Sequence, residues 1–290
     1  MADALKTSSG GAPVAGKPAD GAASPADGTM TGLQINAYVF TTGSTAPSAR
    51  QAIERAREMW RDMPALQAIE KGEGASLLVA DGTQGVVGMT RLVATQFPVA
   101  LLRKAASHAV AWPTVASDLA GHTAHVVVSV VHADPMFAHM LLSHLTAAVL
   151  EQTRGCGVYW VNTGALIPAS GFIAQCNKTA DGHVPAMLWT KVGFARGKSD
   201  DGQPRMLAYT TGLPSFGLLD FECICSADQL RSPVLGFMYG VACGSITRGE
   251  QPTDGTGTKV EAPGVKMVSF HRSPSRRRPN AKAIRLVIHA

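Results

Sequence analysis

The nine histidines of the chain are the first candidates for catalysis or metal binding. A neutral imidazole can act as a base or bind a metal ion. His132, His139 and His144 lie in or beside one predicted apolar helix. His139 and His144 are five residues apart, about 140° around a helix, so they do not share a face. No His pair at i,i+4 spacing and no His-Glu-x-x-His motif occurs. The pattern favours ordinary surface or capped histidines, and it predicts no metal site.

The five cysteines are the second candidates for chemistry: Cys156, Cys176, Cys223, Cys225 and Cys243. Cys223 and Cys225 alternate on a predicted strand and therefore face the same side. A metal would need two further ligands, which Cys243 and a histidine could supply. The simpler interpretation is a pair of small buried side chains. Cys156 precedes a predicted strand with no partner histidine that the sequence identifies, so no catalytic thiol is predicted.

Two glycine-containing segments approach known catalytic motifs without completing them. Gly212-Leu-Pro-Ser215-Phe-Gly217 has one residue more than a nucleophile elbow and lacks the following helix. Gly255-Thr-Gly257-Thr-Lys259 has the wrong spacing for a phosphate-binding loop. The sequence therefore predicts no catalytic residue and no cofactor.

An arginine run, Arg276, Arg277 and Arg278, lies between the last two predicted strands. The chain has a net charge of +5, but six of its basic residues fall in one acid-free segment: Arg272, Arg276, Arg277, Arg278, Lys282 and Arg285. Without them the chain holds 20 basic and 21 acidic residues, which disfavours a broad nucleic-acid surface. The run is interpreted either as a solvated hairpin tip, which is favoured, or as a contact for an acidic partner, RNA or a membrane surface.

Two aromatic residues, Tyr159 and Trp160, are adjacent in a short predicted strand and must face opposite sides of it. Open α/β sheets bind ligands at the carboxyl ends of their strands, so one of these side chains could line a site with His132. Core packing is the favoured alternative. A small-ligand or catalytic site here would include Tyr159–Thr163, with Glu222 as a spare carboxylate.

These residues surround a predicted strand–helix–strand unit. An apolar strand at 125–131, a helix from Pro135 to Gln152 and a strand at 157–161 form a crossover of about 35 residues, the usual size for parallel strands joined by a helix. Before it come a strand at 33–40 and a helix at 48–60, whose Ser48 and Gln51 form a capping-box pattern. Strands at 76–80 and 86–97 and a helix from Pro98 to Trp112 follow.

This order is typical of a ferredoxin-like split βαβ unit, extended by further strands. In the second half of the chain, we predict a hairpin of strands at 185–195 and 205–211 and then a strand at 216–225. A helix from 226 to about 246, a polar loop at 252–264 and a closing hairpin of strands at 265–271 and 284–289 follow. We therefore predict an α+β fold: a mixed sheet with helices mainly on one face.

The predicted domain organisation is a tail followed by one α+β domain over residues 32–290, with possible halves 32–164 and 165–290. Residues 1–31 are rich in Ala, Gly and Pro and have little to bury, so we expect them to be disordered. The tail is either a tether or, as we favour, a dispensable extension. No signal peptide or membrane-spanning helix is predicted, and the sparse cysteines favour the cytoplasm.

Several short patterns together resemble a known family. They are Trp112-Pro113, His125-Val-Val-Val, Gly157-Val-Tyr-Trp160, Tyr209-Thr-Thr-Gly-Leu213 and Phe216-Gly-Leu-Leu-Asp-Phe-Glu222. Their order resembles a bacterial domain-of-unknown-function family with a Gly-Val-Tyr-Trp signature, over residues 33–290. Some members are encoded near type VI secretion or toxin loci. The resemblance implies an accessory or immunity role and no catalytic residues.

The predicted function is a non-enzymatic cytoplasmic protein that binds a protein partner, possible contact residues being His132, Tyr159, Trp160 and Arg276–Arg278. The alternative is an enzyme or a small-ligand-binding protein with its site at the strand ends near His132 and Tyr159–Thr163.

Overall fold

The computed structural model describes residues 32–289 apart from 73, 81–85, 108, 110–111, 199–202, 226–230, 263–264 and 279. The predicted tail at 1–31, the turn at 199–202 and the predicted helix start at 226 lie outside the described residues. Residues Thr31–Ala290 form one compact unit. The described part is α+β, as predicted.

Seven strands form the first sheet, in the order β2-β3-β4-β5-β1-β6-β7. Their bounds are β1 Leu33–Thr41, β2 Leu66–Gly72, β3 Ala75–Ala80, β4 Val86–Val93, β5 Ala124–His132, β6 Gly157–Trp160 and β7 Ala165–Pro168. All neighbours pair antiparallel. Neither β2 nor β7, the two edge strands, was predicted. β2 contains Gln67, Glu70 and Lys71, and β7 has only four residues.

The predicted crossover is present, with one strand inserted in it. The chain leaves β5, runs through helix α4 (Pro135–Thr153) and returns in β6. Both strands pair antiparallel with β1, which lies between them, so β5 and β6 are parallel to each other without being neighbours. The unit is therefore a split βαβ crossover.

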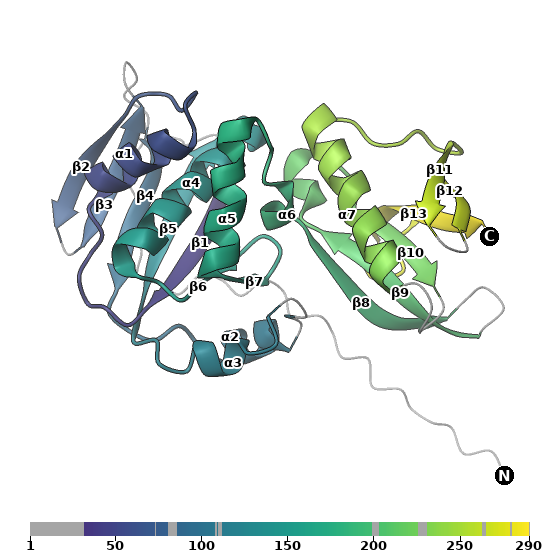
Figure 1. Cartoon of the computed structure of the whole chain (residues 1–290), viewed down its shortest axis with the longest axis horizontal. Helices are drawn as coiled ribbons and strands as arrows, with labels where there is room; N and C mark the ends of the chain where they lie inside the picture. Colours follow the sequence, from purple (N-terminus) through teal and green to yellow (C-terminus); the bar gives the residue numbers. More distant parts are fainter. Residues whose placement is uncertain are drawn as a thin grey trace, which may run out of the picture. The chain divides into compact units, whose positions relative to one another are not determined.

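Helices cover both faces of this sheet, with the larger layer on one. Helices α1 (Ala49–Met59), α4 and α5 (Ala169–Asn177) form that layer (Figure 1). Helices α2 (Val99–Ala106) and α3 (Val115–Asp118) lie on the other. The alternation of β1 explains this division, since Ile35, Ala37 and Val39 belong to the main core while Phe40 contacts the smaller cluster around α3.

The remaining strands form a second sheet instead of extending the first. Its order is β11-β12-β13-β10-β9-β8, and only the β10–β13 pair in this sheet is parallel. The bounds are β8 Lys191–Lys198, β9 Pro204–Thr211, β10 Phe221–Cys225, β11 Gly257–Ala262, β12 Val265–Pro274 and β13 Lys282–His289. Helix α7 (Arg231–Arg248) packs against this sheet, with Phe237 stacked on Phe270.

The two predicted hairpins, β8–β9 and β12–β13, are confirmed. Three local predictions were wrong. Ala186–Trp189 is a short helix, α6, and not the start of a strand, and Leu213–Phe216 is a 3-10 turn, η2, followed by a strand that begins only at Phe221. The segment expected to be a polar loop contains β11. Between α5 and α6 lies a second 3-10 turn, η1 (Lys178–Asp181).

Helix α4 connects the two sheets. Its residues from Leu141 to Leu150 are all buried, because it contacts β1 and β5 on one side and α1, α5 and η2 on others. Trp189 of α6 donates its indole N–H to Ser143 Oγ at 2.8 Å, and Phe216 of η2 packs on the His139 ring at 4.3 Å. The main core therefore runs from the first sheet into the second.

None of the helices in the described part of the chain combines the length and the apolar character needed to cross a membrane.

Substitution of Gly157 tests the close packing at the start of β6. A Cβ at this position would overlap the Trp112 ring and lie 3.0 Å from the Ile167 carbonyl oxygen. We expect Gly157→Ala to lower the free energy of unfolding by about 1–3 kcal/mol, the usual cost of overpacking, as measured by urea denaturation. The matched control is Gly240→Ala in α7, where a Cβ meets nothing within 4 Å. It should stabilise the protein by about 0.5–1 kcal/mol through helix propensity. Equal effects of both substitutions would contradict the packing described.

Candidate functional site

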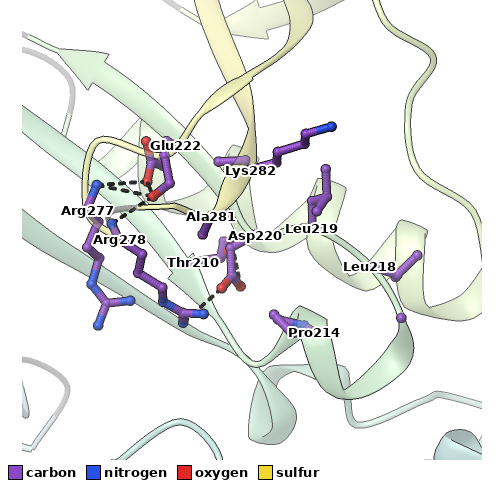
Figure 2. A pocket seen from close by; sticks show the side chains of 13 residues that line it. Thr210, Pro214, Leu218, Leu219, Asp220, Glu222, Arg277, Arg278, Ala281 and Lys282 are labelled. Atoms are coloured by element: carbon purple, nitrogen blue, oxygen red, sulfur yellow. Dashed lines mark hydrogen bonds and ion pairs between the residues drawn. The ribbon is translucent and has the colours of Figure 1, made fainter. Parts of the chain in front are cut away.

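A pocket of about 400 Å³ lies where the strand ends of the second sheet meet the arginine loop, residues 275–278 and 280–281 (Figure 2). Its floor comes from the end of β9 and from the segment that joins η2 to β10, and its rim comes from the arginine loop and the start of β13. Arg277 and Arg278 lie on one side, Leu218 and Leu219 lie on the other, and the Lys282 side chain extends past Leu219 away from the arginines (Figure 2). The pocket thus has two guanidinium groups on one side and apolar residues on the other.

Glu222 holds the arginine loop in place. Its carboxylate accepts hydrogen bonds from Ser275 Oγ at 2.5 Å, from the Arg276 backbone N–H at 2.8 Å and from the Arg277 N–H at 3.3 Å. Ser275 Oγ in turn accepts from the backbone N–H of Arg278 at 2.9 Å. The Glu222 side chain is 3% exposed, so its charge is compensated mainly by these donors.

The second acid of the pocket, Asp220, pairs with the loop through its side chain. Arg278 Nη2 lies 3.1 Å from Asp220 Oδ2, and Thr210 donates to the same carboxylate at 3.3 Å. Burial raises the pKa of Asp220 to about 6, although the Arg278 guanidinium opposes that rise. Asp220 therefore changes its charge close to neutral pH, and with it the strength of its pairing with Arg278.

Arg277 is positioned by an aromatic ring. Its guanidinium carbon lies 4.1 Å from the centroid of the Tyr209 ring, a favourable cation–π distance. The Tyr209 ring lies directly over Gly193, where an added Cβ would come within 2.7 Å of it. Burial lowers the pKa of the neighbouring Lys191, and the charge of Arg277 adds to this effect.

The arginine run and Glu222 were both predicted as candidates, but their contact with each other was not. Arg276, Arg277 and Arg278 are exposed at the tip of the β12–β13 hairpin, as the favoured interpretation has it. The tip is also held in place, because Glu222 binds its backbone and Asp220 and Tyr209 bind two of its side chains. Glu222 is correspondingly not a spare carboxylate near Tyr159. Asp220 and Tyr209 were not predicted as site residues. A signal for Asp220 was present, because Asp220 and Glu222 are acids two residues apart and the basic residues of the chain cluster in one loop that could pair with them.

The other predicted contact residues do not come together. His132 is opposite Leu33 on β1, whereas Tyr159 is opposite Tyr38, so about 17 Å of strand separates them. The His132 ring packs on Phe137 at 4.2 Å and its Nδ1 accepts from the Asp134 N–H.

Tyr159 and Trp160 face opposite sides, as predicted, and neither meets His132. Trp160 is fully buried in the main core, while Tyr159 packs on Phe97 and Tyr38 in the smaller cluster. The structure therefore favours core packing for both rings.

The central histidines are buried. His139 and His144 lie on different sides of α4, as predicted, and each ring hydrogen-bonds a backbone carbonyl one turn earlier. Burial lowers the pKa of His139 to about 4, so this imidazole is neutral at physiological pH.

Cys223 and Cys225 are buried side chains, and all five cysteines are free thiols. Within the described residues, no three His, Cys, Asp or Glu side chains are grouped so that they could hold a metal ion.

Comparisons with protein-family models, with curated proteins and with solved structures found no match to this chain. The family resemblance therefore stays a prediction that rests on the short sequence patterns.

Removing the Glu222 charge tests whether this carboxylate holds the arginine loop. Glu222→Gln replaces one acceptor oxygen by a donor and should leave a loop N–H unpaired, at a cost of about 1–3 kcal/mol. We expect a lower thermal midpoint and faster tryptic cleavage after Arg276 and Arg277. Glu58→Gln is the control, because Glu58 pairs with Arg55 on an exposed helix face, where an ion pair contributes little. Unchanged cleavage in Glu222→Gln would show that the loop is held by other contacts.

Proposed function

We propose that this chain is a binding protein and that the pocket under the arginine loop recognises an acidic, partly apolar segment of a partner protein. The observation that carries the proposal is the fixed arginine loop. Glu222 binds its backbone, which leaves the guanidinium groups of Arg277 and Arg278 at the pocket wall (Figure 2). Preorganised cations bind carboxylates without paying the entropy of loop ordering at the moment of binding.

The charge of the pocket supports an anionic ligand. Three cations, Arg277, Arg278 and Lys282, line it with two acids. Of the acids, Glu222 is occupied by the Ser275 hydroxyl and by backbone N–H donors, and burial raises the pKa of Asp220 to about 6. A carboxylate of the ligand would replace Asp220 as the partner of Arg278, so the pocket exchanges an internal ion pair for an intermolecular one.

The size and the apolar wall of the pocket support a peptide segment over a small inorganic anion. A volume of about 400 Å³ is in the range of sites that hold several side chains or a small organic ligand. Leu218, Leu219 and Pro214 would contact an apolar side chain next to the acidic one. A ligand with alternating acidic and apolar residues fits both walls.

The proposed setting is the cytoplasm, which the five free thiols support. An accessory or immunity role in a bacterial secretion or toxin system would be one use of such binding. That part rests on the sequence resemblance alone.

Binding of a model ligand tests the proposal directly. We expect a fluorescein-labelled peptide of alternating Glu and Leu to bind full-length protein in an anisotropy titration, with affinity that falls as salt rises. Arg278→Gln and Arg277→Gln should each weaken binding about tenfold or more, the loss expected for one charge-assisted contact. Arg205→Gln is the matched control, because Arg205 is exposed at the opposite end of β9. Equal losses in all three variants, or stronger binding of inorganic phosphate or single-stranded RNA at the same arginines, would refute an acidic peptide as ligand.

The pH dependence of this binding has a defined sign. Because the Asp220 pKa is raised to about 6, lowering the pH from 7.5 to 5.5 protonates Asp220 and releases Arg278 for the ligand. We expect peptide affinity to increase over this range, while the peptide carboxylates stay ionised. Asp220→Asn should bind more tightly than wild type at pH 7.5 and should lose the dependence between pH 5.5 and 7.5. A steeper pH dependence in Asp220→Asn would assign the titration to another group.

A further inference from the structure

A second cluster of polar side chains lies on the β12–β13 hairpin and is separate from the pocket. The hydroxyl oxygen of Ser269 is 2.8 Å from His289 Nε2 and 3.0 Å from His271 Nε2. Both imidazoles are exposed, whereas Ser269 is 8% exposed. Two imidazole nitrogens therefore converge on one point at the protein surface.

Strand register explains the convergence. Ser269 and His271 are two residues apart on β12 and face the same side. His289 is opposite Met267, which also faces that side, so His289 is the diagonal neighbour of Ser269 across the hairpin. Long side chains reach a diagonal neighbour in an antiparallel pair. The arrangement therefore follows from the backbone and not from a chance rotamer.

The hydrogen bonds limit the protonation states of the cluster. A hydroxyl group has one proton to donate, so it can donate to only one of the two Nε2 atoms. The other imidazole must then donate its Nε2–H to the hydroxyl oxygen. If instead both rings carry their proton on Nδ1, two Nε2 lone pairs point toward the same space, which is the arrangement that a metal ion requires.

We propose that His271 and His289 form a surface site for a borderline divalent transition-metal ion, such as Zn²⁺ or Cu²⁺, with the Ser269 hydroxyl hydrogen-bonded to water that completes the coordination. Bonds of about 2.0–2.1 Å from Zn²⁺ to each nitrogen bring two ligands to about 3.4 Å from each other in a tetrahedral site. The two Nε2 atoms are no further apart than the sum of their distances to Ser269 Oγ. Rotation of the two exposed rings must supply the remaining approach.

The donor set selects the class of metal. Imidazole suits Zn²⁺ and Cu²⁺, whereas Mg²⁺ and Ca²⁺ require oxygen ligands. Arg285, opposite His271 on β13, adds a positive charge that lowers the affinity for any cation, so binding must come from the imidazole nitrogens. With two protein ligands the site keeps open positions, which a group from a partner molecule could fill.

Isothermal titration of tag-free, full-length protein with ZnCl₂ tests the site. We expect one Zn²⁺ per chain, no competition by a tenfold excess of Mg²⁺, and a rise of the thermal midpoint at saturating Zn²⁺. His271→Ala and His289→Ala should each weaken Zn²⁺ binding at least tenfold. Because both side chains are exposed, these variants should keep the wild-type midpoint in EDTA, which separates loss of a ligand from loss of the fold.

Two controls distinguish this site from other metal-binding groups. His183→Ala removes an exposed histidine elsewhere in the chain and should bind Zn²⁺ like wild type. A Cys156→Ser/Cys243→Ser variant removes the two partly exposed thiols, which are alternative Zn²⁺ ligands, and should also bind normally. Wild-type affinity in both His271→Ala and His289→Ala, or loss of binding in the cysteine variant, would overturn the assignment. Because none of these residues lines the arginine pocket, the peptide and Zn²⁺ titrations fail or succeed independently.

Discussion

Burial of the middle of helix α4, from Leu141 to Leu150, is the constraint on which the rest of the described structure depends. Polar groups buried there have no water as a partner, and an unpaired buried polar group costs on the order of 1–3 kcal/mol. Asp134 caps the first turn of α4 by accepting from two backbone N–H groups. Ser143 accepts from Trp189 in α6, and His144 contacts Thr179 in η1 at 2.7 Å. Ser143 and His144 therefore find side-chain partners in the second half of the chain, whereas His139 Nε2 and Thr146 Oγ1 are buried without a hydrogen-bond partner.

Packing of the second half of the chain against α4 positions the pocket. Phe216 packs against both His139 and Trp189, which also contact each other, and this fixes η2 against α4. The chain leaves η2 through Gly217, whose positive φ of 72° favours glycine, and reaches Asp220 and then β10. Packing around α4 thus determines the positions of Asp220 and Glu222, although none of the pocket-lining residues lies on that helix.

Electrostatics then adapts the pocket to a charged ligand. An arginine loop held only by its side chains would have to be reordered on binding, whereas this loop is held by its backbone through Glu222. The two acids have different roles because their surroundings differ. Glu222 accepts from several N–H and O–H donors. At Asp220 burial is the largest effect on the pKa, and the Arg278 and Arg277 charges and hydrogen bonds from Thr210 and Leu213 offset it only in part. The first acid gives the loop its shape, and the second makes its charge balance sensitive to pH.

The amino-acid sequence by itself determined the elements with strong local signals. The apolar strand before His132, the helix after Asp134 and both hairpins follow from periodicity, capping and turn residues, which act over a few neighbours. It also identified the arginine run, because charge is visible in composition. Only the tertiary structure decided that the strands form two sheets, since edge strands such as β2 and β7 are defined by their partners and have weak patterns of their own. The pairing of Glu222 with a loop more than 50 residues away was likewise decided by the parallel β10–β13 contact. Pairing between strands far apart in sequence depends on the packed core, which no local pattern encodes.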